Sequence, residues 1–216
     1  IGGGATGLGA LVDASSRGYR TLLLEQHDFA KATSSRSTKL IHGGVRYLKE
    51  GNVSLVLEAL RERGFLCRNA PHLVHNLAFV IPVYPWWEGP VSGIGMKVYD
   101  RLAGQLGFAP SRTLTREETI ERIPTVEQDG LLRGVIYHDG QFDDSRLAVE
   151  LARTATELGG CPLNYVRVEG LIDDGELVRG VTARDVESGE RFSIEARVVI
   201  NATGVFADEV RRMDAP

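Results

Sequence analysis

Apolar residues recur along the chain first at helical spacing and then in short continuous runs, which indicates alternating helices and strands. After a glycine-rich start, residues 8–16 have the pattern of a helix that stops at Arg17 and Gly18. Residues 19–25 then form an apolar run of strand length. The chain is therefore expected to open with a β-turn-α-β unit. Ile1 is the one residue of its first strand that the sequence contains.

The middle of the chain has a different pattern and predicts an insertion. Residues 54–68 have the apolar spacing of an amphipathic helix, and residues 77–84 form a strand-like run bounded by prolines. Residues 94–106 again have a helical pattern. Thr115 begins a capping-box sequence, so a short helix is expected between Thr115 and Pro124.

The α/β alternation resumes in the last part of the chain, which predicts a second half of the first domain. Residues 1–75 and 126–216 are therefore assigned to one Rossmann-like α/β domain and residues 76–125 to an inserted α+β segment. The elements expected after the insertion are a strand over 134–137, a helix over 144–158 with Asp144 as its N-cap, a strand over 163–168, a hairpin of 177–181 and 192–196 with Gly189 in its turn, and a buried strand over 198–204.

The composition argues against several classes of function. A net charge of -4 and a pI near 5.8 argue against nucleic-acid binding, for which a basic surface is expected. Cys67 and Cys161 fit no metal-ligand spacing, so we predict two buried, reduced thiols and no metal site. No apolar run reaches the roughly 18 residues that span a bilayer. Trp86 and Trp87 suit either packing within the insertion or an interface with a membrane or partner.

The first motif that carries chemistry is the glycine pattern at the start of the chain. Gly2, Gly4 and Gly7 form G-x-G-x-x-G, in which small residues allow a tight turn and let backbone amides approach a pyrophosphate at a helix N-terminus. Glu25 ends the next predicted strand, where a carboxylate accepts hydrogen bonds from ribose hydroxyls. This pattern predicts a dinucleotide site and leaves NAD and FAD as alternatives.

Two later segments separate these alternatives. Residues 33–48 join hydroxyl side chains, cations and a Gly-Gly pair directly after the predicted ribose-binding strand, and Asn201 to Gly204 place small residues after an apolar run. With residues 2–7, 70–72, 99–100 and 143–147, these segments make nearly the whole chain resemble the N-terminal part of FAD-dependent glycerol-3-phosphate dehydrogenases and the related α-glycerophosphate oxidases. We expect further sequence before Ile1 and after Pro216.

This resemblance implies the fold of the FAD-dependent amine and hydroxy-acid oxidoreductases. Residues 1–75 and 126–216 would form an incomplete FAD-binding domain, and residues 76–125 would belong to the substrate domain. Residues 33–35 are implied beside the cofactor phosphates, residues 39–44 beside the isoalloxazine ring and Val168 on the adenine side. The full set of expected FAD contacts is Gly2, Gly4, Thr6, Gly7, Glu25, Gln26, Thr33, Ser34, Ser35, Lys39, Leu40, Ile41, Gly43, Gly44, Val168, Ala202, Thr203 and Gly204.

The same resemblance implies three residues of the substrate site. His42 matches the family's proton acceptor, and an imidazole suits removal of a hydroxyl proton as a hydride passes to the flavin. Arg46 and Tyr47 match positions that bind the substrate, where a guanidinium takes a phosphate bidentately. The alternative for His42 is a packed structural histidine; for Arg46 and Tyr47 it is a surface arginine and a core tyrosine.

The expected activity is oxidation of sn-glycerol 3-phosphate to dihydroxyacetone phosphate, with electrons passed to quinone or to oxygen. Two alternatives remain open: a related flavoenzyme acting on another hydroxy or amine substrate, and a flavin-binding fragment without catalytic function. We expect a cytoplasmic protein, peripheral association with the cytoplasmic membrane and a homodimer, and no nucleic-acid partner.

Overall fold

The chain forms two compact units, as seen in a computed structural model that describes residues 1–44, 47, 50–85, 88–104 and 107–214. One unit comprises Ile1–Thr38 and Asp144–Pro216, and the other comprises Lys39–Asp143. The sequence pattern had placed the boundaries of the insertion at residues 76 and 125. The compact second unit therefore begins earlier and ends later than the predicted insertion, and a substrate-binding role for it stays a prediction.

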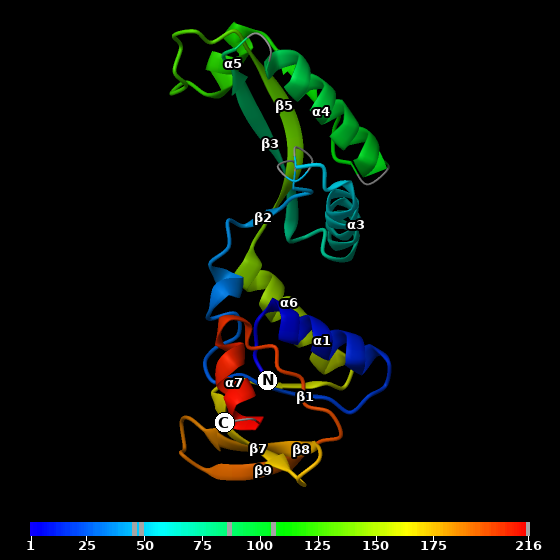
Figure 1. The fold of residues 1–216 in the computed structure, drawn as a ribbon, viewed down its shortest axis with the longest axis vertical. Helices are drawn as coiled ribbons and strands as arrows, with labels where there is room; N and C mark the ends of the chain where they lie inside the picture. Colours follow the sequence, from blue (N-terminus) through cyan, green and yellow to red (C-terminus); the bar gives the residue numbers. More distant parts are fainter. Residues whose placement is uncertain (45–46, 48–49, 86–87, 105–106, 215–216) are drawn as a thin grey trace. The chain divides into compact units, whose positions relative to one another are not determined.

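The first unit is built on a pair of packed helices and a short parallel strand pair (Figure 1). Helix α1 (Ala5–Ser16) lies against helix α6 (Asp144–Glu157). Strands β1 (Leu22–Leu24) and β6 (Cys161–Leu163) pair in parallel, with Leu22 opposite Cys161. The buried side chains that join these elements are Leu8, Leu11, Leu23, Ala30, Ala148, Ala152 and Ala155.

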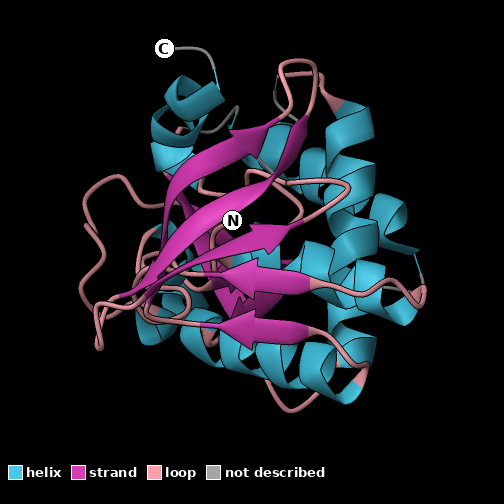
Figure 2. Ribbon diagram, turned by 90° about the horizontal axis from the view of Figure 1, so that it is seen from below, coloured by secondary structure: helices cyan, strands magenta, loops and turns pink. Residues whose placement is uncertain are grey.

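A three-stranded antiparallel sheet completes the first unit (Figures 1 and 2). Its order is β7 (Val166–Asp173), β8 (Val178–Asp185) and β9 (Arg191–Glu195). A second apolar cluster of Leu24, Val166, Val168, Val181 and Ala183 connects this sheet to the end of β1. The chain then passes through the short 3-10 helix η3 (Gly204–Phe206) into α7 (Ala207–Asp214).

The second unit is an antiparallel sheet with helices packed against it. Its long strands are β3 (Val74–Val83) and β5 (Arg133–Phe142), which pair along their full length, while β2 (Leu40–Ile41) and β4 (Arg112–Leu114) pair with β5. Helices α3 (Val53–Asn69), α4 (Glu88–Ala103) and α5 (Arg116–Arg122) complete it. The core side chains are Val56, Leu60, Val83, Met96, Tyr99, Ala103 and Val135.

Most predicted elements are present, but two predicted strands are wrong. The run over 163–168 is divided between β6 and β7, because Tyr165 between them has a positive φ of 57° that a continuous strand cannot contain. The run over 198–204 forms no strand, and Val198 and Ile200 are 74% and 55% exposed. Among the described residues, its strand-like backbone bonds are the two with Ile1: the Ile1 carbonyl accepts from Ala202 N, and the Ile1 amino group donates to the Ile200 carbonyl.

Three further expectations concern single residues. Asp144, predicted as the N-cap, is instead the first residue of α6, and its carboxylate accepts the amide hydrogen of Ser145 at 2.8 Å. Both cysteines are free, but Cys161 is exposed and Cys67 is half-buried, so predicted burial is wrong for Cys161 and only partial for Cys67. Cys161 lies on a three-residue strand whose partner, among the described residues, is β1. Burial raises the pKa of the Cys67 thiol. Trp86 and Trp87 lie outside the described residues.

Among the helices that the structure describes, none combines the length and the apolar character needed to cross a membrane. Within the same residues, no group of three or more His, Cys, Asp or Glu side chains is placed to hold a metal ion.

The capping box predicted at Thr115 is present and can be tested. Thr115 Oγ1 accepts from Glu118 N at 3.1 Å, and Glu118 Oε2 accepts from Thr115 N at 2.8 Å. We expect Thr115→Ala to lower the free energy of unfolding by about 1 kcal/mol, because first-turn amides of α5 lose their acceptor. Urea unfolding followed by circular dichroism measures this, with the exposed Thr125→Ala as control. Equal stability of the two variants would contradict the assignment.

Candidate dinucleotide site

The glycine loop at the start of the chain is tightly constrained by the backbone around it. Gly2 has a φ of 106°, in the region that favours glycine, and its amide donates to the carbonyl of Leu24 at 2.9 Å. A Cβ on Gly7 would stand 1.9 Å from the Gly2 carbonyl oxygen. The first and last glycines of the motif are therefore required by the turn itself.

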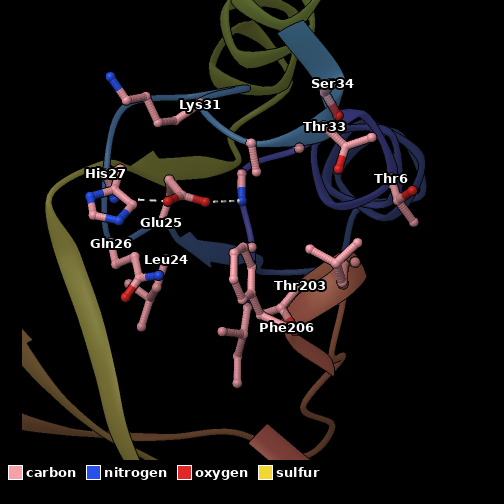
Figure 3. Close-up of a pocket in the computed structure, with 18 of the residues that line it drawn as sticks. Thr6, Leu24, Glu25, Gln26, His27, Lys31, Thr33, Ser34, Thr203 and Phe206 are labelled. Atoms are coloured by element: carbon pink, nitrogen blue, oxygen red, sulfur yellow. Dashed lines mark hydrogen bonds between the residues drawn. The ribbon is translucent and has the colours of Figure 1, made fainter. Parts of the chain in front are cut away.

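Glu25 fixes the loop from the end of β1. Its Oε2 accepts the amide hydrogen of Gly3 at 2.7 Å, and its Oε1 accepts that of His27 at 2.8 Å. Each carboxylate oxygen has a second lone pair, which leaves the side chain able to accept from a ribose hydroxyl as well. Figure 3 shows Glu25 between His27 and the glycine loop.

A pocket of about 600 Å³ opens beside these residues, within the size range of small-molecule and cofactor sites. It gathers segments from both ends of the sequence, because the first unit contains both. Figure 3 shows the side chains of Thr6, Thr33 and Ser34 on one side of it. The predicted cofactor residues that line it are Gly2, Gly4, Thr6, Glu25, Gln26, Thr33, Ser34, Val168, Ala202, Thr203 and Gly204.

Hydroxyl groups hold the segment that follows β1. The 3-10 helix η1 (Thr33–Ser35) places Ser34 Oγ 2.9 Å from the amide of Ala5, the first residue of α1. Ser37 donates through its amide and its hydroxyl to the buried carboxylate of Asp144, at 3.2 and 2.8 Å. These bonds tie the segment to the start of α1 and to the start of α6.

The late loop is shaped by one asparagine rather than by a strand. Asn201 Oδ1 accepts from the hydroxyl of Thr203 at 2.6 Å and from its amide at 3.2 Å, while Asn201 Nδ2 donates to the carbonyl of Ala207 at 2.9 Å. A Cβ on Gly2 would meet the carbonyl oxygen of Ala202 at 2.6 Å. The loop therefore lies against the glycine turn although it is not β-structure.

Several pocket residues were not singled out from the sequence. His27 and Lys31 lie in the loop that follows β1, and Phe206 is the last residue of η3, directly before α7. For His27 and Lys31, the signal that could have found them is their position at the carboxyl end of a strand, where ligands bind in α/β proteins. Arg36 and Arg167 also line the pocket and, with Lys31, give it three cationic side chains.

The predicted residues outside this pocket fall into two groups. Gly7 is closed off by the carbonyl of Gly2, and Ser35 belongs to η1 without lining the cavity. The others belong to the second unit: Lys39, Leu40, Ile41, His42, Gly43, Gly44 and Tyr47. Arg46 lies outside the described residues.

The segment of the second unit has a well-defined local structure. Leu40 and Ile41 pair with Gln141 and Gly140 of β5, and His42 follows them with an exposed side chain. Tyr47 is 41% exposed, so it is not a core tyrosine.

One hydrogen bond determines how the His42 ring is oriented. The amide of Gly44 donates to His42 Nδ1 at 3.1 Å. In the neutral ring this assigns the proton to Nε2, because one nitrogen accepts and the other donates. Nδ1 of this neutral ring can take up a proton once the bond opens, through movement of the Gly44 amide or rotation of the exposed imidazole.

The residues of the pocket fit FAD by the chemistry of their donors and acceptors. Amides at the start of α1, together with Lys31 and Arg36, suit a pyrophosphate. The carboxylate of Glu25 suits a ribose, and the apolar side chains of Val166 and Val168 suit a planar base. A Cβ at Gly2 or Gly7 would collide with backbone and distort this cradle.

Comparison with known proteins agrees with this assignment. The sequence model of the family described as FAD dependent oxidoreductase matches residues 1–216, so the chain belongs to that family. FAD, the predicted cofactor, and the predicted α/β fold of FAD-dependent oxidoreductases are confirmed at this level.

Within this family, the predicted resemblance to glycerol-3-phosphate dehydrogenases is also confirmed. The mitochondrial glycerol-3-phosphate dehydrogenase of Saccharomyces cerevisiae is 46% identical over 224 aligned residues, which cover 99% of this chain and 34% of that protein. The human mitochondrial enzyme is 43% identical, with coverage of 99% and 31%. The chain thus spans about one third of the length of the curated relatives it matches.

Solved structures show the same similarity. Glycerol-3-phosphate dehydrogenase from Bacillus halodurans complexed with FAD has a TM-score of 0.77 and 34% identity, covering 100% of this chain and 35% of that one. L-proline dehydrogenase from P. horikoshii has a TM-score of 0.73 at 20% identity, with coverage of 99% and 54%, and this likeness shows the fold alone.

A matched pair of glycines in α1 tests the cradle. We expect Gly7→Ala to weaken FAD binding at least about tenfold, because the added methyl group collides with the Gly2 carbonyl and moves the helix start. Gly9→Ala is the control, since a Cβ there meets nothing within 4 Å and alanine favours a helix. Titration of the apoprotein with FAD, followed by flavin fluorescence, measures both. Equal affinities for the two variants would argue against the site.

Proposed function

We propose that the protein containing this chain oxidises sn-glycerol 3-phosphate to dihydroxyacetone phosphate as an FAD-dependent enzyme. The observation that carries the proposal is 43–46% identity over essentially the whole chain to glycerol-3-phosphate dehydrogenases. The 34% identity to the FAD complex of another such enzyme supports it. As the chain covers about a third of these proteins, further substrate contacts belong to regions of the enzyme outside it.

In this proposal the two units have different tasks. The glycine turn, Glu25 and the hydroxyls of Thr33 and Ser34 hold the cofactor, with Lys31 and Arg36 beside its phosphates. When bound, FAD supplies the acceptor for the hydride that leaves the carbinol carbon. The proposed contacts of residues 39–44 with the flavin ring belong to the second unit.

His42 is the proposed proton acceptor. Its exposed imidazole takes the hydroxyl proton of the substrate after Gly44 N–H releases Nδ1. The proposed partners of the substrate phosphate are Arg46 and Tyr47; the exposed phenol of Tyr47 has the access that such a contact needs.

The remaining partners are part of the same proposal. Electrons pass to quinone or to oxygen, and the protein forms a homodimer with peripheral attachment to the cytoplasmic membrane. A cytoplasmic location is proposed, whereas the two relatives described above carry "mitochondrial" in their names.

A substrate panel tests the activity directly. We expect the full-length protein with FAD to reduce a dye acceptor with glycerol 3-phosphate and to be inactive with glycerol, glycine and proline, because only the first offers both a carbinol and a phosphate. Turnover of an amino acid instead would establish the related oxidoreductase as the correct alternative. Bound flavin without turnover of any substrate would favour a flavin-binding protein without catalytic function.

The role of His42 has its own test. We expect His42→Asn to retain FAD and to slow reduction of the flavin by glycerol 3-phosphate about 100-fold, because the amide is no base. His72→Asn is the control, an exposed histidine of the same unit. Stopped-flow absorbance of the flavin gives the rates, and a rate within twofold of wild type for His42→Asn would remove His42 from the mechanism.

A further inference from the structure

The second unit contains a buried charged network that its fold alone does not require. Arg63 of α3, Tyr99 of α4 and Asp139 of β5 are at most 2% exposed. Arg63 Nη1 lies 2.5 Å from Asp139 Oδ1, and the hydroxyl of Tyr99 donates to Asp139 Oδ2 at 2.9 Å. Figure 1 shows the three elements that contribute these side chains.

Burying an ion pair costs desolvation free energy. A buried ion pair in a core therefore draws attention to the groups that it positions. The desolvation of two charges often exceeds their attraction, and apolar side chains of the same volume would stabilise a core at least as well. Arg63 also lies over the ring of Phe108, with 4.9 Å from its guanidinium carbon to the ring centroid. The network is therefore better explained by positioning than by stability.

Tyr99 is the member that connects the network to the backbone. Burial and the neighbouring carboxylate of Asp139 raise the pKa of Tyr99, so its hydroxyl stays protonated and donates a hydrogen bond to Asp139. Its oxygen then accepts the amide hydrogen of Gly43 at 2.9 Å. Gly43 is the residue directly after His42.

Glycine is required at position 43 by this contact. A Cβ there would stand 2.4 Å from Leu60 Cδ2 and 2.5 Å from the Tyr99 hydroxyl oxygen. The space that a side chain would need is thus occupied by the anchoring group and by a core leucine. The next residue, Gly44, donates its amide hydrogen to His42 Nδ1.

We propose that Tyr99, held by Asp139 and Arg63, is a positioning residue that fixes the Gly43 amide and, through it, the His42 imidazole for proton transfer. The inference rests on the proposed function, in which His42 accepts the substrate proton. The histidine itself is exposed, so its own side chain has little packing to hold it, and the buried tyrosine supplies that restraint.

Tyr99→Phe and His42→Asn, singly and together in the full-length holoenzyme, test the inference. We expect Tyr99→Phe to slow flavin reduction at saturating glycerol 3-phosphate about tenfold, with the substrate concentration for half-maximal rate changed less than about threefold. In the His42→Asn background it should slow reduction no further, because residues acting as one unit are not additive.

Tyr137→Phe is the matched control. Tyr137 is a half-buried tyrosine of the same core, stacked on Phe79 at 5.3 Å and edge-on to Tyr99 at 6.4 Å between ring centroids. It loses the same hydroxyl without affecting the Gly43 anchor. We expect its reduction rate to stay within twofold of wild type.

Hydrogen exchange gives a measurement independent of turnover. In the wild-type protein the Gly43 amide should exchange slowly although His42 beside it is exposed, and Tyr99→Phe should speed that exchange at least tenfold while Tyr137→Phe leaves it unchanged. Rapid exchange of Gly43 in wild type overturns the proposal even if Tyr99→Phe does not fold.

The outcomes distinguish this inference from the proposed function. Additive slowing in the double variant would mean that Tyr99 acts on core stability alone, and the inference would be wrong. A wild-type holoenzyme whose flavin is not reduced by glycerol 3-phosphate would overturn the proposed function, whereas the exchange measurements would still test whether Tyr99 anchors Gly43.

Discussion

The carboxylate of Glu25 is the interaction on which the geometry of the dinucleotide site depends. It accepts one amide hydrogen from the glycine loop and one from the loop that follows β1. A single side chain therefore holds both of these walls of the pocket in place. Hydrogen bonds to a charged acceptor contribute about 1.5–3 kcal/mol each, more than neutral ones. With the glycine turn held in this way, the helix start, η1 and the Asn201 loop are brought to the same cavity.

The second unit uses a related arrangement at a different glycine. There the amide of Gly43 is held by a neutral phenol, whose own orientation is fixed by a buried ion pair. Both units thus fix a glycine amide that lies next to a residue of proposed function. Glu25 lies at the edge of the pocket, which suits contact with a ligand. Tyr99 lies in the core, which suits restraint of the backbone.

Local sequence patterns predict much of the secondary structure, and the remaining elements depend on tertiary contacts. The helical spacing before Arg17, the capping box at Thr115 and the turn at Gly189 are encoded within a few residues and are present as expected. Tyr165 has no local signal for a positive φ. The apolar run over 198–204 has the composition of a strand, but its strand-like backbone bonds within the described residues are the two to Ile1.

The candidate site was predictable to a similar degree. The glycines and Glu25 follow from spacing alone, and the residues of the second unit followed from resemblance to a family. Neither route pointed to Arg63, Asp139 or Tyr99 as a network, because partners 40 and 76 positions apart in sequence leave no periodic signal. Contacts of this kind become visible only when the sheet brings α3, α4 and β5 together.

The start of α1 links cofactor occupancy to stability. The helix begins after Gly4, which has no side chain to cap the first-turn amides. The hydroxyl of Ser34 accepts the amide hydrogen of Ala5 instead. A glycine N-cap costs roughly a few tenths of a kcal/mol relative to Ser or Asp, and a bound phosphate would accept from first-turn amides that no side chain caps. A ligand that binds only the folded state stabilises it, so scarcity of flavin would lower the stability of the first unit as well as withhold its chemistry.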